Sequence, residues 1–245
     1  MPAENRNIMI KIKDLYKRFG DNVVLKGFDM DLLEGENLVI MGKSGSGKSV
    51  MIKCLMGLMQ PDSGYVEIMG EKVLEMEHQE LDFLRKKIGF LFQGSALYDS
   101  MTVKENLEFP LRKQDMPREE KDKLVFQALE SVGLLDAIDL LPNELSGGMK
   151  RRIALARAII LHPKIIIYDE PTTGLDPITA KEIVQLMRDI QKIYGSSALI
   201  ITHDVDCSRV IADRMILLID GVNYAEGSFK ELSNSKDEKI QAFFK

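Results

Sequence analysis

A glycine-rich segment holds the side chains best suited to chemistry on a phosphate group. Residues 42–49 read Gly-Lys-Ser-Gly-Ser-Gly-Lys-Ser, between the apolar run at 38–41 and a helical pattern. Glycines let backbone N–H groups curl around a phosphate, and the N-terminus of the following helix adds partial positive charge. The second lysine can place a point charge on the β- and γ-phosphates, and the serine after it suits Mg²⁺. A chance glycine–serine turn would rarely be flanked in this way, so the pattern predicts a phosphate-binding loop. Its residues are Gly42, Lys43, Ser44, Gly45, Ser46, Gly47, Lys48 and Ser49.

Two adjacent carboxylates, Asp169 and Glu170, end the apolar run at 165–168. Side chains at the end of a buried parallel strand emerge at the carboxyl edge of the sheet, the usual ligand crevice of α/β proteins. Adjacent strand residues point to opposite faces, so we expect the two carboxylates to do different work. Asp169 is the candidate Mg²⁺ partner, and Glu170 is the candidate group that polarises an attacking water. The alternative is a pair of solvated acids at a strand end.

Other polar residues follow apolar runs in the same way. Gln93 ends the run at 90–92, and its amide could serve both a metal ion and a water molecule. His203 follows the run at 200–201 and could reach a γ-phosphate, although a histidine there is more often structural. Asp176 precedes Pro177, which is typical of a helix N-cap, and it could be both cap and ligand contact. Ser146-Gly147-Gly148 opens a helical pattern and could form a second anion site, cap its own helix, or do both.

The elements that must position these residues alternate between strand and helix. Ile8, Ile10 and Ile12 alternate with less apolar neighbours, and the pattern continues through 24–32, which predicts an N-terminal antiparallel β layer. Residues 38–41, 165–168 and 198–201 are continuous apolar runs typical of central parallel strands. A helix is expected from Val50 to Met59, helical sequence fills residues 95–160, and another helix runs from Pro177 to a stop at Gly195. Its apolar face is expected to comprise Ile183, Leu186, Met187, Ile190 and Ile193.

Composition excludes several classes of protein. The formal net charge of −5 argues against a nucleic-acid binder, which usually carries a basic excess. No apolar run approaches the ~20 residues needed to cross a bilayer, and the first seven residues lack the apolar core of a signal peptide. We therefore expect a cytosolic chain without a membrane span, whose membrane role would come through a partner. Cys54 and Cys207 are expected to be small buried thiols rather than metal ligands.

The ordered motifs resemble the ATP-binding cassette (ABC) ATPases. Their counterparts here, in chain order, are the phosphate loop at 42–49, Gln93, Leu145–Met149, the strand and carboxylates at 165–170, Gly174–Asp176 and His203. The resemblance implies one α/β domain with the P-loop NTPase fold: a RecA-like core at about 1–94 and 161–232, an N-terminal antiparallel β layer, an inserted helical subdomain at about 95–160 and a C-terminal extension at 233–245. It also implies ATP hydrolysis with Mg²⁺.

The resemblance assigns roles to individual residues. Catalysis falls to Lys48, Gln93, Glu170 and His203, and the metal ligands are Ser49, Gln93 and Asp169. Phe19 stands where the family stacks an aromatic ring on adenine. Ser146, Gly147, Gly148 and Asp176 contact nucleotide, because in this family the Ser-Gly-Gly loop caps the ATP held by the opposite subunit. A head-to-tail homodimer is therefore implied, with two ATP molecules buried between the chains.

A finer resemblance points to the Mla/Mce-type lipid-transport ATPases. Met149 stands where most of the family has glutamine, and the segment 91–103 is also similar to theirs; Pro171–Asp176, in contrast, follows the general pattern. The implied partners are an integral membrane permease (MlaE-like) and a Mce-type lipid-binding subunit, at the cytoplasmic face of the inner membrane. Leu97, Tyr98 and Met101 are candidate permease contacts or core residues, and the end of the chain from Ile240 could dock on a partner or pack on its own domain. The alternatives are an amino-acid or peptide transporter, and, less compatible with the acidic charge, a soluble ABC protein acting on ribosomes or DNA.

Overall fold

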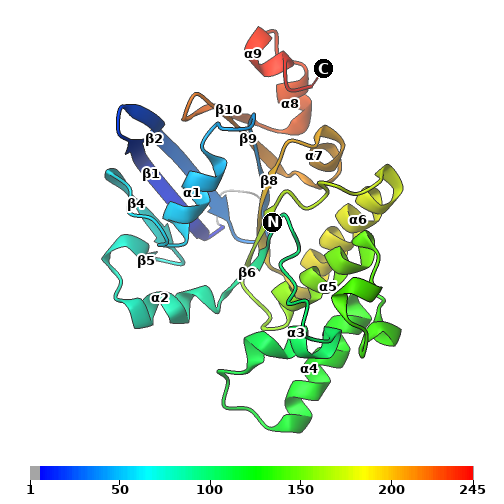
Figure 1. Cartoon of the computed structure of the whole chain (residues 1–245). Helices are drawn as coiled ribbons and strands as arrows, with labels where there is room; N and C mark the ends of the chain where they lie inside the picture. The colour runs from blue at the N-terminus through cyan, green and yellow to red at the C-terminus, as the bar shows by residue number, and fades with distance from the viewer. Residues whose placement is uncertain (1–5, 245) are drawn as a thin grey trace. The chain divides into compact units, whose positions relative to one another are not determined.

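The computed structural model describes residues 6–244, and its chain divides into two compact units (Figure 1). Residues up to Arg85 and from Ser196 onward form the first unit, and Lys86–Gly195 form the second. Residues 1–5 and Lys245 lie outside the described part, so the expected absence of a signal peptide at the N-terminus is not tested.

The first unit contains the expected antiparallel layer. Strand β1 (Ile8–Phe19) pairs with β2 (Asn22–Leu33) and with β4 (Ser63–Ile68), and β5 (Glu71–Lys72) completes the order β2-β1-β4-β5. Ile10 and Ile12 are fully buried, as the alternation predicted, but Ile8 at the start of the strand is 39% exposed, which corrects its place in that pattern. The pairing shifts after Ile12, where Asp14 takes a left-handed φ of 47° and lets Leu15 turn inward.

A mixed sheet in the same unit carries the phosphate loop. Strand β3 (Asn37–Met41) is buried along its length and pairs in parallel with β8 (Ser197–Thr202) and β9 (Arg214–Ile219); β10 (Val222–Gly227) runs antiparallel to β9. Besides α1, which follows the phosphate loop, the described helical elements of this unit are the 3₁₀ turn η2 (Val73–Glu75), α2 (His78–Arg85), α7 (Val205–Ile211), α8 (Phe229–Ser233) and α9 (Glu238–Gln241).

Helix α1 spans Lys48–Leu55, so the expectation of a helix from Val50 to Met59 was wrong at both ends. The helix begins earlier because the phosphate loop leads straight into it. It stops earlier because Gly57, at φ 62°, ends it with a Schellman motif, in which the N–H of Leu58 donates to Lys53 O at 2.8 Å and that of Gly57 to Cys54 O at 3.0 Å.

The second unit combines a parallel strand pair with the three longest of the described helices. Strand β6 (Ile88–Leu91) pairs with β7 (Ile165–Asp169), and the intervening chain forms α3 (Val103–Glu108), η3 (Phe109–Leu111), α4 (Arg118–Ser131), η4 (Leu135–Ala137), η5 (Pro142–Glu144) and α5 (Gly147–Ile159). These helices share one apolar cluster that includes Leu107, Val125, Leu129 and Ile153. They are the green ribbons of Figure 1.

Helix α6 (Pro177–Tyr194) begins and ends where the sequence predicted. Asp176 caps its N-terminus, and Gly195 ends it with a left-handed φ of 62°. Ile183 and Ile190 are fully buried, but Ile193 is 66% exposed, which corrects its assignment to the apolar face. Three residues beyond Ile190, the helix has rotated Ile193 off the packed stripe.

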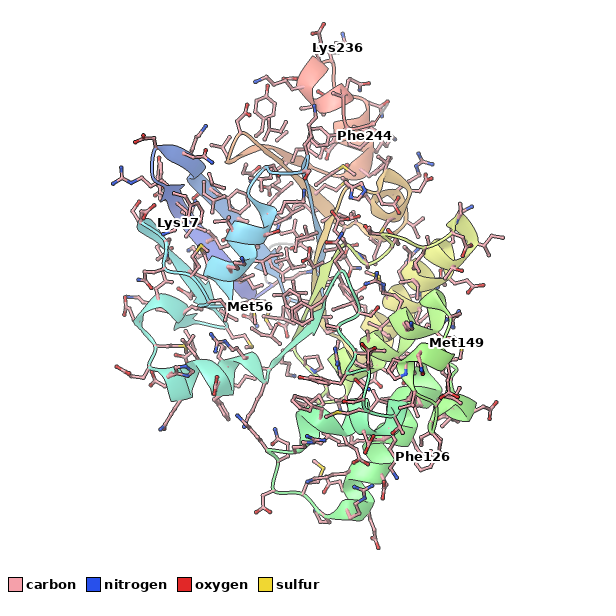
Figure 2. The ribbon with its side chains drawn as sticks, in the orientation of Figure 1. Lys17, Met56, Phe126, Met149, Lys236 and Phe244 are labelled. Atoms are coloured by element: carbon pink, nitrogen blue, oxygen red, sulfur yellow. The ribbon has the colours of Figure 1, made fainter. Side chains whose placement is uncertain are left out.

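The C-terminal segment packs on its own unit. Ile240 is buried, the Phe244 ring meets Phe229 edge-on at 5.4 Å, and the Tyr224 hydroxyl donates to Asp237 at 2.8 Å. Figure 2 places Lys236 and Phe244 in this segment. Cys54 and Cys207 are buried free thiols, as expected. Between residues 6 and 244, no helix combines the length and apolarity that a membrane span requires.

Candidate functional site

The phosphate loop has the geometry that its glycines predicted. Gly45 and Gly47 both take positive φ, 79° and 107°, and Gly47 stands directly before α1. A Cβ on Gly47 would meet the Leu25 side chain at 2.9 Å and the Val24 carbonyl at 3.3 Å, and its φ of 107° strains any other residue, so glycine is favoured there. The ammonium of Lys48 folds back to donate to the carbonyls of Gly42, at 2.5 Å, and Lys43, at 3.0 Å. The loop is thus already curled, with its lysine held beside its own main chain.

Two further predicted residues, His203 and Phe19, lie in the first unit at the ends of strands. Met41 and Thr202 are paired across β3 and β8, so the phosphate loop and His203 leave the sheet at the same edge, as predicted. The backbone on either side of His203 is held, because the N–H of Asp204 donates to Thr202 Oγ1 at 3.0 Å and Asp204 caps α7. Phe19 ends β1 with 48% of its surface exposed, as a ring that stacks on a base would require.

A cavity of about 690 Å³ borders the first half of the phosphate loop. Residues 43–46 form one wall, and the start of β2, the turn at 218–221 and helix α9 form the others. Lys26, Lys43 and Lys239 line it together with Asp220 and Glu238. The C-terminal segment therefore lies within reach of the loop, which the sequence left undecided.

In the second unit, the carboxylate pair has a geometry that simple strand alternation does not describe. Strand β7 ends at Asp169, and Glu170 takes a left-handed φ of 50°, so Glu170 is not the next residue of the strand and the alternation argument fails there. Such a backbone costs on the order of 1–3 kcal/mol for a residue other than glycine and clusters at functional sites. Glu170 is 8% exposed, and its Oε2 accepts a hydrogen bond from the Thr173 hydroxyl at 3.2 Å. Its carboxylate is therefore held by the loop that follows it.

Gln93 leaves the same edge of this strand pair as the carboxylates, as predicted. Leu91 and Tyr168 are paired across β6 and β7, so both polar segments begin beyond that rung. Gln93 is exposed, and the chain then turns through Ser95 and Ala96, both at positive φ.

The Ser-Gly-Gly loop caps its own helix, as one interpretation predicted. Ser146 Oγ accepts from the N–H of Met149 at 3.2 Å, and Met149 lies in the first turn of α5 (Figure 2). A Cβ on Gly148 would come within 2.7 Å of the Thr179 side chain, so glycine lets α5 approach the start of α6. Asp176 accepts from the N–H groups of Ile178 and Thr179 and from the Thr179 hydroxyl, which chiefly lowers the pKa of its carboxyl. The cap interpretation of Asp176 is thus confirmed, and its contact with nucleotide stays a prediction.

Sequence reasoning missed the buried polar residues that hold these loops. Arg151, on α5, is 4% exposed and donates to the carbonyls of Phe92 and Thr173. Arg157, four-fifths along the same helix, donates to Ser95 O at 3.1 Å, and Asn106 is fully buried beneath Tyr98–Thr102. A signal existed for Arg151: it stands four residues before Leu155, on the apolar stripe of the helix.

The predicted metal ligands suit Mg²⁺. Ser49, Gln93 and Asp169 offer hydroxyl, amide and carboxylate oxygens, the donors that this ion prefers over the nitrogen and sulfur of zinc sites. Among the residues described, no group of three or more His, Cys, Asp or Glu side chains could hold a metal by itself. In phosphoryl transfer, Mg²⁺ bridges the nucleotide's phosphates and neutralises their charge, and Ser49, Gln93 and Asp169 would supply its protein ligands.

Comparison with known proteins agrees with this chemistry. Residues 25–173 match the family model of the ABC transporter. The chain is 37% identical over 242 residues to the methionine import ATP-binding protein MetN of Brucella suis, covering 98% of this chain and 65% of that protein. It is 36% identical over 242 residues to the intermembrane phospholipid transport system ATP-binding protein MlaF of Haemophilus influenzae, covering 98% and 91%. The chain thus spans less than two thirds of the length of the Brucella suis methionine import relative.

Solved structures show the same fold. The dimeric ATP-binding cassette MJ0796, in a post-hydrolysis state bound to ADP and Pi, has a TM-score of 0.81 and 36% identity, with 90% of this chain and 99% of that chain covered. The cbiO1 protein of Clostridium perfringens, part of the cbiONQ ABC transporter complex, has a TM-score of 0.87 and 29% identity, with 98% and 96% covered. The predicted α/β P-loop NTPase fold is therefore confirmed. The chain belongs to the ABC transporter family, as an ATP-binding cassette with the fold of an ATP-hydrolysing enzyme whose general metal cofactor is Mg²⁺.

Proposed function

We propose that this chain is the ATP-hydrolysing, energy-coupling subunit of a bacterial transporter that moves phospholipids or other lipids between membranes. The observation that carries the hydrolytic part is Glu170, a carboxylate held in a strained backbone at the end of β7 by a hydroxyl three residues away. A strained, positioned carboxylate at the carboxyl edge of a parallel strand pair is suited to polarising a water molecule.

Hydrolysis in this proposal consists of positioning and charge stabilisation. The loop amides and Lys48 hold the β- and γ-phosphates, and Glu170 orients the attacking water. His203 stabilises the transition state, and Phe19 stacks on the adenine. Ser49, Gln93 and Asp169 would hold Mg²⁺ together with the phosphates, and the ion would supply positive charge against the negative charge that develops.

Two copies of the chain complete each site. Ser146, Gly147 and Gly148 form an exposed or half-exposed helix N-terminus, whose N–H groups suit an anion supplied by another molecule. The dimeric cassette related to this chain supports a head-to-tail homodimer, in which this loop and Asp176 contact the ATP of the partner copy. ATP then closes the dimer, hydrolysis reopens it, and an MlaE-like permease at the cytoplasmic face of the inner membrane receives the motion.

The lipid assignment rests on sequence features and one relative. Met149 in the signature loop and the segment 91–103 resemble lipid-transport ATPases, and MlaF of Haemophilus influenzae is 36% identical. A methionine or other amino-acid importer is the second candidate, because the MetN relatives are 37% identical. Purification of the tagged chain from detergent-solubilised membranes, with mass spectrometry of bound proteins and lipids, separates the two. A Mce-type subunit with copurifying phospholipid supports the first, and a periplasmic amino-acid receptor replaces it with the second.

The hydrolytic proposal is tested with Glu170→Gln. The variant should bind ATP like the wild type, while its turnover falls by about 10²–10³-fold, the loss typical of one positioned catalytic group. Glu130→Gln, an exposed carboxylate on α4, is the matched control and should turn over normally. Wild-type turnover by purified Glu170→Gln would remove Glu170 from its role.

A further inference from the structure

A single buried guanidinium ties together two loops of the candidate site. Arg151 lies one turn into α5, and Nη1 donates to the carbonyl of Phe92 at 2.8 Å, the residue before Gln93. Nη2 donates to the carbonyl of Thr173 at 3.2 Å, in the loop after Glu170. The helix that starts at Ser146 is thus bonded to both the Gln93 segment and the Glu170 loop.

The contact at Thr173 continues to the carboxylate. The Thr173 hydroxyl donates to Glu170 Oε2 at 3.2 Å, and its N–H donates to the Glu170 carbonyl at 3.3 Å. Thr173 therefore binds Glu170 at both its side chain and its main chain, while its own carbonyl accepts from Arg151. The resulting chain of hydrogen bonds runs from Arg151 through Thr173 to Glu170.

Burying the Arg151 guanidinium costs desolvation free energy, so its position calls for a geometry that an apolar residue lacks. Both acceptors are main-chain carbonyls rather than carboxylates, its Nε is buried without a hydrogen-bond partner, and burial lowers the pKa of the guanidinium. An apolar side chain would fill this position with less desolvation. What an apolar residue cannot do is hold two carbonyls at a fixed separation, as the planar fork of arginine does.

The two hydrogen bonds of Arg151, called the clamp from here on, bear on the strained backbone of Glu170. A left-handed backbone at a residue other than glycine persists only where its surroundings over-determine it. Here the surroundings include the two Thr173 bonds, and Arg151 fixes the loop that carries them.

We propose that Arg151 is a positioning residue for ATP hydrolysis. It acts through Thr173 to orient the Glu170 carboxylate, and it fixes the position of the Gln93 segment relative to the Glu170 loop. This inference rests on the proposed role of Glu170. It assigns the Ser-Gly-Gly helix a mechanical function in its own subunit, in addition to any contact with the partner's nucleotide.

The experiment measures single-turnover ATP hydrolysis and nucleotide affinity in the full chain at a temperature well below melting. Arg151→Met and Thr173→Val should each lower the rate about 10–100-fold, because misplacing a reacting group by ~1 Å can cost 10²-fold. ATP affinity should change less than about threefold, and Thr173→Ser, which keeps the hydroxyl, should restore most of the rate. Arg152→Met is the matched control and should stay within about twofold of wild type. Its guanidinium, on the next residue, bonds instead to Val132 O and Glu182.

Combination with Glu170→Gln separates positioning from a structural role. If Arg151 and Thr173 act through Glu170, adding either substitution to Glu170→Gln should cause no further loss. Equal losses in both backgrounds, or wild-type rates for Arg151→Met and Thr173→Val while Glu170→Gln is slow, would overturn the inference and leave the proposed function standing. If Glu170→Gln itself is fast, the proposed function fails first. Thr173→Val and its serine counterpart keep the test decisive should Arg151→Met fold poorly.

Discussion

Replacing Asn106 with alanine should destabilise the helical part of the second unit. The Asn106 side chain is fully buried, and its Oδ1 accepts from the N–H of Tyr98 at 2.8 Å. Its Nδ2 lies 3.0–3.1 Å from the carbonyls of Tyr98, Met101 and Thr102. One amide group thereby bonds four main-chain groups between Tyr98 and Thr102.

The size of the effect follows from the bonds removed. Two amide protons and one acceptor correspond to about three hydrogen bonds, each contributing ~1 kcal/mol net. Water can reach part of the exposed turn, so we expect a loss of about 2–3 kcal/mol. For a chain of this size, that lowers the melting temperature by about 4–12 °C.

Thermal unfolding followed by circular dichroism measures the shift, with the exposed Asn143→Ala on η5 as the control. Asn106→Asp should be at least as unstable as Asn106→Ala at neutral pH, because its carboxylate faces the carbonyls that Nδ2 now satisfies. Burial raises the pKa of such a carboxyl, so acidification protonates it and restores one hydrogen-bond donor. The difference in melting temperature between Asn106→Asp and the wild type should therefore become smaller at acidic pH. If Asn106→Ala melts within a degree of Asn143→Ala, the cluster does not stabilise this turn and the reasoning is refuted.

Three further outcomes can be checked. Lys48→Ala should weaken ATP binding by on the order of tenfold or more, because it removes the loop's point charge; wild-type affinity in a fluorescent-nucleotide titration would contradict this. Ser146→Ala loses its N-cap bond, worth ~1 kcal/mol, and in the Glu170→Gln background it should also abolish the ATP-dependent dimer in light scattering, whereas a persistent dimer would argue against shared sites. The Thr179 hydroxyl lowers the pKa of Asp176, so the cap stabilises the fold above the unfolded-state pKa and this stability is lost as the pH falls through the folded-state pKa. The advantage of wild type over Asp176→Asn in melting temperature should therefore shrink at acidic pH, and an advantage that grew on acidification would show the sign to be wrong.

Local signals predicted much of the fold and the conformation of the phosphate loop. The alternation at 8–12, the buried run at 38–41 and the Asp176-Pro177 start with its Gly195 stop all appear in the structure as expected. Each of these signals lies within one turn or one strand, where steric and hydrogen-bonding rules act on neighbours in the chain. The same is true of the phosphate loop, where Gly45 and Gly47 allow the positive φ angles that its curl requires.

Only the tertiary structure decided how the second unit holds its candidate catalytic residues. The left-handed backbone of Glu170, the clamp from Arg151 and the burial of Asn106 depend on contacts between segments near 92, 151 and 173, or between 98 and 106. No local rule predicts an arginine buried against two carbonyls, because a charged side chain is by itself more stable in water. That arrangement arises because packing of α5 brings distant main-chain carbonyls to one place and leaves them in need of a donor.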